Sequence, residues 1–469
     1  MSGTIPALFE AAAADAGDRV WLRFEDEEYT YAQARARIGG AAAALAERGV
    51  ERGDRVLLVA PNDPATLFTW FAITYLGAVA VAANPHTSEA ELCGLRDQLE
   101  PRLVIERAEL APERDPDGRG PAQPGDAAVM IPTSGTTGRS KLVTQTHRAY
   151  AMAGEGFPWW MELDAGDRLM TSLPLFHVNA PAYSVLGSVA ARAGLVLLPR
   201  FSASGFLDAA RRHGATEFNA IGAMLEILMR QPERDDDAEN PIRLVYTGPS
   251  PAKQRQLEIE ARFGLRIVCG YAMSETPYGM IWPRGERPYG TLGKPRQHPE
   301  LGRVNDARVV DGELQLRNPA IMLGYYGMPE ETSRVLLDDG WLRTGDLVRA
   351  NEDGTYTYVG RQKEMIRRRG ENLAPAEVEE ALASHPDVVE AAVVGVPSEL
   401  GEEEVKAFVV VSRAADLAAL RAHAAERLTR FKVPRYVEAV PELPHTPTGR
   451  VAKHELTRDR TDDEVDFDS

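Results

Sequence analysis

A run of small hydroxyl residues and glycines, TSGTTGRSK, extends from Thr133 to Lys141 and directly follows a short apolar stretch. Glycines leave backbone N–H groups free to surround a polyphosphate, the hydroxyls add donors, and the lysine adds positive charge. The pattern is not a Walker A loop, because no G-x-x-x-x-G-K-[ST] match occurs. It therefore indicates phosphate binding, with a flexible Ser/Gly loop that binds nothing as the alternative.

Four further polar motifs accompany this loop, and most of them follow apolar, strand-like segments. They are Tyr271–Thr276 (YAMSET), Arg343–Asp346 (RTGD), Gly360–Asn372 (GRQKEMIRRRGEN) and Thr446–Lys453 (TPTGRVAK). The chain has only seven lysines among 53 cationic residues, and three of them lie in these five motifs. Lysine is a compact ammonium and arginine a planar fork, so a retained lysine points to a task that arginine cannot perform.

In this order and at these spacings, the five motifs resemble those of the acyl-adenylate-forming superfamily of acyl-CoA synthetases, peptide-synthetase adenylation domains and luciferases. The resemblance covers essentially the whole chain, with a loose similarity to crotonobetaine- and aryl-CoA-ligase-like members. Any one motif would be weak evidence, whereas all five together are specific. The resemblance implies an AMP-forming acid–thiol ligase, in which a carboxylic acid and MgATP give acyl-AMP and pyrophosphate, and the thiol of CoA then displaces AMP.

The resemblance also assigns the ATP site. The Ser274 hydroxyl would contact the α-phosphate, and Glu275, together with Thr136, would hold Mg²⁺. Asp346 would accept hydrogen bonds from both ribose hydroxyls, and Arg361 would reach the ribose or a phosphate. The remaining nucleotide-binding residues would be Thr133, Ser134, Gly135, Thr136, Thr137, Gly138, Lys141 and Tyr271. Taken singly, Glu275 could form a surface salt bridge, Asp346 could be a turn residue and Arg361 an ordinary surface arginine.

Lys453 would be the catalytic lysine of the first half-reaction, because the attack of a carboxylate on a phosphate brings two anions together and a bridging ammonium neutralises them. Lys363 would be the hinge at which a small C-terminal domain swings between an ATP-using and a thiol-using orientation. Gly370 would line the channel that admits CoA, since a missing side chain allows close approach. Arg367–Arg369 could attract CoA phosphates, although three arginines in a row more often mark a solvated face.

The acyl pocket is predicted around His177, which would lie between the pocket and the thiol tunnel, with a buried structural histidine as the alternative. The other predicted pocket residues are Asn179, Gly222, Tyr246, Gly248 and Met273. Two positions depart from the family pattern. Ser140 replaces the usual proline before Lys141, and Ser274 replaces the usual threonine but keeps the hydroxyl.

The elements that position these motifs follow from the apolar pattern of the 469 residues. Helices and short buried strands alternate up to about residue 290, which is typical of parallel sheets covered on both faces. Thr30 is a predicted N-cap for a helix over 31–48, and a second helix is predicted over 66–77. Short strands then indicate a small β-rich unit or barrel, and an α+β segment follows residue 361. The acidic end, 461–469, is predicted to fray.

We therefore predict an α/β fold with a large N-terminal domain of doubly wound sheets plus a small β-rich unit (1–361), carrying the ATP and acyl sites. A small mobile α+β domain (362–469) would carry the catalytic lysine. The net charge of −17 and pI of about 5.1 argue against a nucleic-acid binder. No secretory signal and no apolar run of about 18 residues is evident, so we expect no membrane span and a cytoplasmic location.

The sequence leaves several points open. It does not reveal the carboxylic acid, and the acceptor could instead be a carrier-protein thiol, an amine or a small nucleophile such as nitrite. A non-catalytic nucleotide-binding relative is a further alternative, against which Glu275, Asp346 and Lys453 argue. The oligomeric state is also open, with a homodimer as one option.

Overall fold

The computed structural model is described for residues 3–116, 122–133, 141–248, 250–368, 371–398, 403–412, 415–446 and 451–467. The chain divides into two compact units. The first comprises Met1–Arg308, Gln315–Arg343 and Asp353–Thr355, and the second Val309–Leu314, Thr344–Glu352 and Tyr356–Ser469. The predicted functional boundary between residues 361 and 362 stays a prediction. No helix in the described ranges has the length and apolarity needed to cross a membrane.

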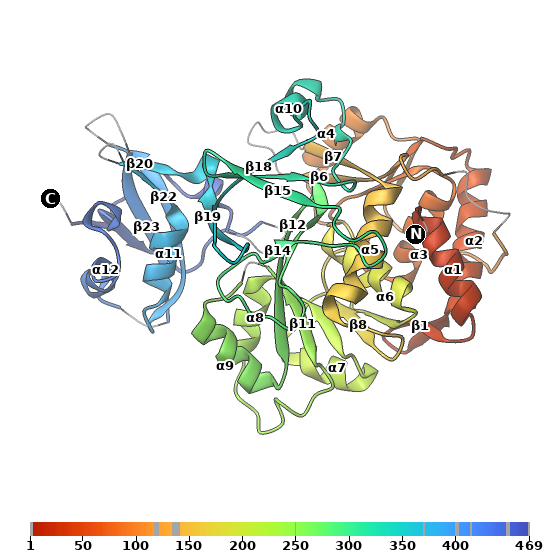
Figure 1. The fold of residues 1–469 in the computed structure, drawn as a ribbon, viewed down its shortest axis with the longest axis horizontal. Helices are drawn as coiled ribbons and strands as arrows, with labels where there is room; N and C mark the ends of the chain where they lie inside the picture. Colours follow the sequence, from red (N-terminus) through yellow and green to blue (C-terminus); the bar gives the residue numbers. More distant parts are fainter. Residues whose placement is uncertain are drawn as a thin grey trace. The chain divides into compact units, whose positions relative to one another are not determined.

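A nine-stranded sheet in the first unit has the order β14-β13-β12-β11-β10-β8-β9-β1-β2 (Figure 1). Its strands are β1 (Val20–Phe24), β2 (Glu27–Thr30), β8 (Arg168–Thr171), β9 (Gly194–Leu197), β10 (Glu217–Asn219), β11 (Leu244–Thr247), β12 (Arg266–Met273), β13 (Thr276–Ile281) and β14 (Lys294–Pro295). The six strands from β12 to β1 in this order run parallel to their neighbours. Antiparallel pairs close both ends of the sheet.

A six-stranded sheet in the same unit has the order β17-β7-β6-β4-β3-β5. Its strands are β3 (Arg55–Leu58), β4 (Val79–Ala82), β5 (Leu103–Ile105), β6 (Ala127–Thr133), β7 (Lys141–Thr146) and β17 (Gly324–Tyr325). The helices of this unit are α1 (Ile5–Ala16), α2 (Tyr31–Glu47), α3 (Pro64–Tyr75), α4 (Glu89–Leu99), α5 (His147–Met161), α6 (Leu186–Ala191), α7 (Phe206–His213), α8 (Gly222–Met229), α9 (Lys253–Phe263) and α10 (Pro329–Val335). A π-helix, η1 (Ala180–Val185), precedes α6, and a short 3₁₀ helix, η2 (Ala203–Gly205), precedes α7.

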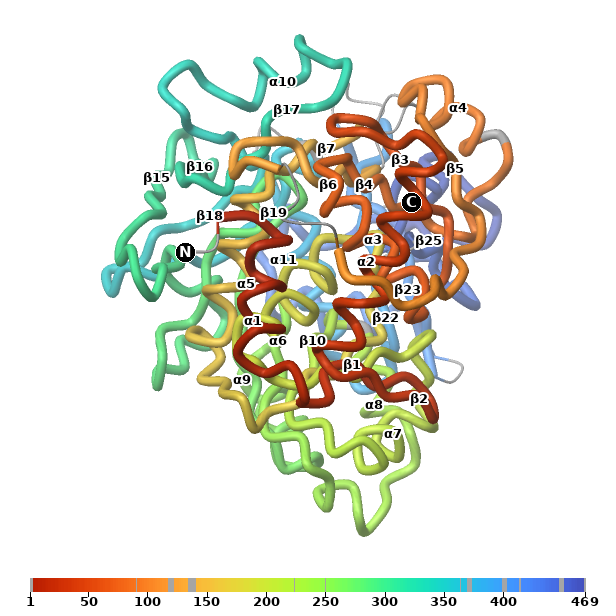
Figure 2. The backbone as a smooth tube through the Cα atoms, turned by 90° about the vertical axis from the view of Figure 1, so that its right-hand side faces the viewer, coloured from red at the N-terminus to blue at the C-terminus, as the bar shows by residue number. Residues whose placement is uncertain are grey.

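Both faces of the six-stranded sheet are covered, as the continuous apolar runs predict. Successive side chains of a strand point to opposite faces, so Val56 and Leu58 join the main core with α1, α2 and α3. Leu57 and Val59 instead pack with Leu92 and other residues of α4 on the other face. The backbone trace shows α3 and α4 on opposite sides of β3 (Figure 2). Helix α5 contacts β6 and β7 as well as β13 of the nine-stranded sheet, so it packs between the two sheets.

The helix starts follow local hydrogen-bonding groups. Thr30 caps α2 in a capping box with Gln33, which confirms the predicted N-cap. Helix α3 begins at Pro64 rather than at residue 66, because Asp63 caps it and proline is favoured in the first turn.

A four-stranded sheet follows, with the order β15-β16-β18-β19. It is the predicted small β-rich unit, and it is an open sheet and not a barrel. Its strands are β15 (Asp306–Val310), β16 (Glu313–Arg317), β18 (Leu342–Ala350) and β19 (Tyr356–Arg361). The second unit then has η3 (Gln362–Glu364), the hairpin β20 (Ile366–Arg368) and β21 (Glu371–Leu373), and α11 (Pro375–Ala383). Its main sheet has the order β22 (Val388–Pro397), β23 (Glu403–Val411), β24 (Tyr436–Ala439) and β25 (Glu464–Asp466), joined by α12 (Leu417–Ala425), η4 (Arg430–Lys432) and η5 (Lys453–Glu455).

The predicted fraying of residues 461–469 is wrong up to residue 467. Residues 464–466 form β25, which pairs antiparallel with β24. The reason is a buried ammonium group. Lys406 of β23 is fully buried, and its Nζ lies 2.7 Å from Glu464 and 2.9 Å from Glu438. A buried charge needs a hydrogen-bonded counter-charge, so the acidic end of the chain is held in the sheet.

Removing this buried cation should destabilise the protein. Lys406→Met removes the buried ammonium from Glu438 and Glu464 and leaves Glu464 paired only with the more exposed Arg460, so we expect the free energy of unfolding at pH 7 to fall by about 3–5 kcal/mol. The matched control is Lys432→Met, whose half-exposed pair with Glu377 should contribute only about 0–1 kcal/mol. Urea unfolding followed by circular dichroism measures both, and equal losses for the two variants would contradict the assignment.

The ion pair of Lys406 with Glu464 should also make the stability of the protein depend on pH. Burial alone would raise the pKa of Glu464, but Lys406 and Arg460 hold it below its ordinary value. A depressed carboxyl pKa contributes stability above the unfolded pKa, and this contribution is lost as the pH falls through the folded value. The difference between wild type and Lys406→Met should therefore shrink once the pH falls below about 4, near the ordinary glutamate pKa.

Candidate active site

Except for Tyr246, the predicted pocket residues lie at or after the carboxyl ends of parallel strands in the nine-stranded sheet. His177 and Asn179 follow β8, Gly222 follows β10, and Gly248 follows β11. Met273 ends β12. Because β8, β10, β11 and β12 are neighbours in the sheet and run parallel, these positions lie along one edge. The carboxyl edge of parallel strands is where α/β proteins bind ligands.

The two ends of the predicted phosphate loop are joined in a hairpin. Strands β6 and β7 pair antiparallel with Thr133 opposite Lys141. The Thr133 hydroxyl also donates to the Lys141 carbonyl oxygen at 3.2 Å. Five residues predicted to contact phosphates, Ser134, Gly135, Thr136, Thr137 and Gly138, lie outside the described residues. The hairpin nevertheless fixes where the loop begins and ends.

Ser274 and Glu275 form the two-residue turn between β12 and β13, with Met273 opposite Thr276. Gln145 of β7 is fully buried, and its Nε2 donates to the Ser274 carbonyl oxygen at 2.6 Å. The N–H of Met322 donates to the Glu275 carbonyl oxygen at 2.9 Å. The Gln145 bond attaches the Ser274–Glu275 turn to β7, the strand that follows the predicted phosphate loop, so the structure brings the two predicted motifs together.

Tyr325 completes this connection. Its hydroxyl donates to Glu275 Oε1 at 2.8 Å, and the Lys141 Nζ lies 4.4 Å from the centroid of its ring. Tyr325 belongs to β17, which pairs with β7 at Val143. A cation over a tyrosine face is attracted by the ring quadrupole. One tyrosine therefore contacts both the lysine of the phosphate loop and the carboxylate predicted to hold Mg²⁺.

The chemistry of Glu275 fits a magnesium ligand. Mg²⁺ is usually held by one or two carboxylates together with substrate phosphates and water. Tyr325 uses one carboxylate oxygen of Glu275. Within the described ranges, no group of three His, Cys, Asp or Glu side chains forms a separate metal cage. A single carboxylate beside a phosphate loop is the arrangement expected for a metal that arrives with ATP.

The predicted pocket residues are only partly brought together. Asn219 Nδ2 donates to Asn179 Oδ1 at 2.7 Å, which connects the segments after β8 and β10. Gly222 opens α8, and a Cβ added there would meet open space, whereas one added at Gly248 would lie 2.3 Å from the Gly270 carbonyl oxygen. His177 is half-buried beside Phe176. Its role stays a prediction.

Tyr246 lies in the interior of the first unit. It is 4% exposed and packs against Phe157 and Tyr183, and its hydroxyl accepts a hydrogen bond from the buried Arg296. Burial raises the pKa of Tyr246, and Arg296 opposes that shift. Its contacts therefore indicate packing around Arg296, and its predicted role in the acyl pocket stays untested.

The residues predicted to hold ribose meet within the second unit. Asp346 of β18 is opposite Arg361 of β19, and Arg361 Nε donates to Asp346 Oδ1 at 2.8 Å. The Asp346 side chain is 3% exposed and that of Arg361 43%. Gly345, with φ +71°, provides the left-handed turn before Asp346, and its N–H donates to Glu313. The carboxylate is thus held in a fixed, charge-paired position.

Lys453 lies in η5 between two carboxylates of its own unit. Its Nζ is 2.7 Å from Glu379 Oε1 and 3.3 Å from Glu364 Oε2, and its side chain is 21% exposed. Glu379 Oε1 also accepts the Val393 N–H at 2.7 Å. Burial raises the pKa of Glu379, and the Lys453 ammonium opposes that shift. The predicted catalytic lysine is therefore a partly accessible cation with a defined position.

The predicted hinge residue Lys363 lies in η3, and its side chain falls outside what the structure describes. Gly370 and Arg369 also lie outside the described residues. Arg368 corrects the prediction made for the arginine run. It is 4% exposed, is ion-paired with Glu404, and donates to the carbonyl oxygens of Phe431 and Val433. Arg368 is a buried structural residue, so it neither attracts CoA nor belongs to a solvated face.

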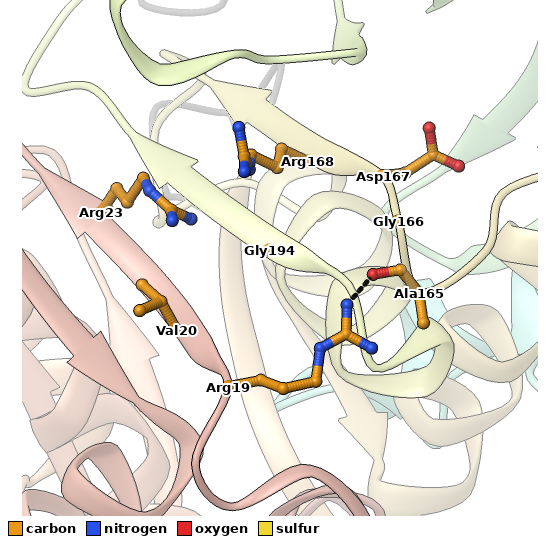
Figure 3. A pocket seen from close by; sticks show the side chains of 8 residues that line it. All are labelled: Arg19, Val20, Arg23, Ala165, Gly166, Asp167, Arg168 and Gly194. Atoms are coloured by element: carbon orange, nitrogen blue, oxygen red, sulfur yellow. Dashed lines mark hydrogen bonds between the residues drawn. The ribbon is translucent and has the colours of Figure 1, made fainter.

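A cavity of 230 Å³ lies at the opposite edge of the nine-stranded sheet (Figure 3). Strands β1, β8 and β9 begin there, at Val20, Arg168 and Gly194, and Arg19 donates to the Ala165 carbonyl oxygen beside them. None of the predicted site residues lines this cavity. Since ligands bind at the carboxyl ends of parallel strands in such folds, it is separate from the candidate active site.

Two family models match the chain. The model for the AMP-binding enzyme matches residues 9–326, and that for the AMP-binding enzyme C-terminal domain matches residues 377–450. The chain belongs to the AMP-binding enzyme family. The α/β architecture described above confirms the predicted fold class, and the family match confirms the predicted resemblance.

Relatives of this AMP-binding enzyme are similar over nearly their full length. A crotonobetaine/carnitine–CoA ligase of Salmonella agona is 29% identical, with 94% of this chain and 96% of the relative covered. ATP-bound MatB from Rhodopseudomonas palustris is 26% identical with a TM-score of 0.86, covering 97% and 98% of the two chains. O-Succinylbenzoate-CoA synthetase (MenE) from Bacillus subtilis, in complex with its acyl-adenylate intermediate, is 25% identical with the same TM-score and coverage.

Several residues that organise this AMP-binding enzyme have no sequence signal of their own. Tyr325 and Gln145 join the ATP-site motifs, Asn219 contacts Asn179, and Glu379 contacts Lys453. None of these residues belongs to one of the five sequence motifs. Glu379 could have been found from its spacing on α11, since it lies one turn beyond Pro375 in an acidic segment. Tyr325 could not be singled out in the same way, because it follows the apolar residues Ala320–Leu323 and has a second tyrosine, Tyr326, beside it.

The Asp346 assignment can be tested by substitution. A buried carboxylate that accepts hydrogen bonds from two ribose hydroxyls should contribute about 1.5–3 kcal/mol for each bond. We expect Asp346→Ala to raise the KM for ATP at least about tenfold and to slow adenylation. Asp353→Ala is the matched control, because Asp353 only caps the turn at Thr355. Steady-state kinetics with varied ATP measure both, and an unchanged KM and kcat in Asp346→Ala would show that Asp346 serves only its structural pair with Arg361.

Proposed function

We propose that this AMP-binding enzyme activates a carboxylic acid as its acyl-adenylate, releases pyrophosphate, and transfers the acyl group to the thiol of CoA. The observation that carries the proposal is the connection of the phosphate-loop hairpin to Glu275 through Tyr325. The names of the CoA-ligase relatives and the ATP and acyl-adenylate of the solved neighbours support it.

In the first half-reaction, a carboxylate oxygen attacks the α-phosphorus of ATP, the bond to the bridging oxygen breaks, and pyrophosphate leaves. Lys141 and the loop N–H groups would hold the β- and γ-phosphates, and the Ser274 hydroxyl would donate to the α-phosphate. Glu275, together with Thr136, would hold Mg²⁺, which neutralises charge on the phosphates when bound. Asp346 and Arg361 would fix the ribose. Charge neutralisation and alignment are the main contributions that a protein makes to such a transfer.

In the second half-reaction, the CoA thiol attacks the acyl carbonyl carbon and AMP leaves with the electron pair of the broken acyl–phosphate bond. His177 and Gly370 would lie on the path of the thiol. The acyl group would lie among the segments that follow β8, β10 and β11. We also propose rotation of a C-terminal domain at Lys363 between the two steps, a cytoplasmic location, and a homodimer as the assembly to be checked by light scattering.

The function is tested with a panel of carboxylic acids, each assayed for release of pyrophosphate and AMP with CoA present and absent. We expect one class of acid to give pyrophosphate and, with CoA, a thioester. Parallel arms with a carrier protein, amines and nitrite identify another acceptor. Formation of ADP and phosphate, or no acid-dependent release with any member of the panel, would contradict the proposal.

The Lys453 assignment predicts unequal effects on the two steps. Lys453→Ala should lower the rate of adenylate formation by at least about 100-fold, because electrostatic groups in the transition state contribute several kcal/mol. Thioester formation from supplied acyl-AMP should be largely unchanged. Lys432→Ala, at a half-exposed ion pair of the same unit, is the control. Equal losses in both half-reactions would refute the role of Lys453 in adenylation.

The hinge assignment predicts the opposite split. Proline fixes φ near −65° and removes an N–H, so Lys363→Pro should trap one orientation of the C-terminal domain. Because adenylation would need Lys453 from that domain, we expect the ATP-using orientation to be retained and the thiol step to fall more. Pyrophosphate release, acyl transfer and thermal unfolding are measured separately. Equal loss in both steps at unchanged stability would move the hinge elsewhere.

A further inference from the structure

We infer that Tyr325 is a positioning residue of the ATP site, whose ring holds the Lys141 ammonium and whose hydroxyl orients the Glu275 carboxylate. The ring thereby keeps the two charges from neutralising each other. This inference rests on the proposed function, because it assigns Lys141 to phosphate and Glu275 to Mg²⁺.

The backbone of Tyr325 is fixed on both sides. The N–H groups of Leu323 and Tyr326 donate to Thr144 and Leu142 of β7 at 2.8 and 2.9 Å. The N–H of Tyr325 donates to Thr332 Oγ1 of α10 at 2.9 Å. Gly324 has φ +140°, and a Cβ there would lie 2.8 Å from Thr332, so only glycine fits before the tyrosine. The side chain is 7% exposed. Its ring is therefore held in one place.

The charges that meet at this ring would otherwise attract each other. Lys141 Nζ lies 4.4 Å from the ring centroid, and Glu275 Oε1 accepts the hydroxyl at 2.8 Å. Within the described part of the chain, Lys141 and Glu275 form no ion pair with each other, although one tyrosine contacts both. A direct pair would occupy the ammonium needed by phosphate and the carboxylate needed by the metal. The aromatic ring contacts the cation without taking its hydrogen-bond donors.

The two contacts also support each other. A phenol that donates to a carboxylate gains electron density, which strengthens the attraction of its ring for a cation. Tyr325 thus connects the positions of the phosphate-loop lysine and of the metal-binding carboxylate. A tyrosine that only filled the core would need neither its hydroxyl nor these two charged neighbours.

Two substitutions separate the contacts. Tyr325→Phe keeps the ring and loses the hydroxyl, whereas Tyr325→Leu loses both. The control is Tyr326→Phe, since the adjacent ring faces Arg55 and packs on the α4 side of the sheet. Thermal unfolding is measured with ATP in EDTA and with ATP and increasing Mg²⁺, and pyrophosphate release is measured at the same Mg²⁺ concentrations.

We expect Tyr325→Phe to keep the wild-type thermal shift with ATP in EDTA but to need about tenfold more Mg²⁺ for the half-maximal further shift and rate. Tyr325→Leu should lose most of both shifts, and Tyr326→Phe should match wild type. The inference is overturned if Tyr325→Phe has wild-type Mg²⁺ dependence, or if both Tyr325 variants lose the two shifts to the same extent. Failure of the proposed function is distinct, because wild type would then bind MgATP without acid-dependent release of pyrophosphate.

Discussion

The hydrogen bond from Tyr325 to Glu275 is the constraint on which the proposed ATP site depends. Together with the contact of the Tyr325 ring with Lys141, it connects three segments that are far apart in the chain: the start of β7, the turn after β12, and the two-residue strand β17. The six-stranded sheet contributes the hairpin and β17, whereas the nine-stranded sheet contributes the turn. The buried Gln145 adds a second tie between the same sheets. Together with the bond from the Met322 N–H to the Glu275 carbonyl oxygen, these ties hold the turn that carries the carboxylate near the strand that begins at Lys141.

Three of the seven lysines show how the surroundings decide what one ammonium group does. Lys406 is fully buried between Glu438 and Glu464, so its charge stabilises the sheet of the second unit. Lys453 faces two carboxylates but stays 21% exposed. Lys141 contacts an aromatic face. Desolvation makes the first pair structural, whereas the other two cations keep donors that a phosphate could use.

Much of the fold follows from local pattern. The side chains of Thr30 and Asp63 cap the first turns of α2 and α3, so these helix starts can be predicted locally. Val56 and Leu57 are both apolar and point to opposite faces of β3, which indicates a core on each face of the strand. Helix α5 is harder to predict. It packs between the two sheets, so it lacks a polar face, and it contains Gly154, Gly156 and Pro158. A Cβ at Gly154 would lie 2.6 Å from Leu186, so long-range packing, not helix propensity, selects glycine there.

In the candidate site too, some residues are marked by local motifs and others are brought in only by the fold. Short motifs mark Thr133, Lys141, Ser274, Glu275 and Asp346, because the chemistry needs those residue types close together in sequence. Tyr325 and Gln145 act across the fold and have no neighbours that mark them. Arg368 misleads, since an arginine between two others looks solvated until its partner Glu404 is seen 36 positions away on β23. Long-range pairing therefore sets the limit of what the sequence predicts.

The proposed activity depends on one chemical event, the attack of a substrate carboxylate on the α-phosphorus of ATP. The most direct measurement uses the acid identified by the panel, labelled with ¹⁸O in both carboxylate oxygens, followed by mass spectrometry of the nucleotide after one turnover with CoA. We expect AMP that carries one ¹⁸O atom, because the attacking carboxylate oxygen leaves with AMP, and pyrophosphate that carries none. Unlabelled AMP, or a label in phosphate released with ADP, would contradict the proposed activity.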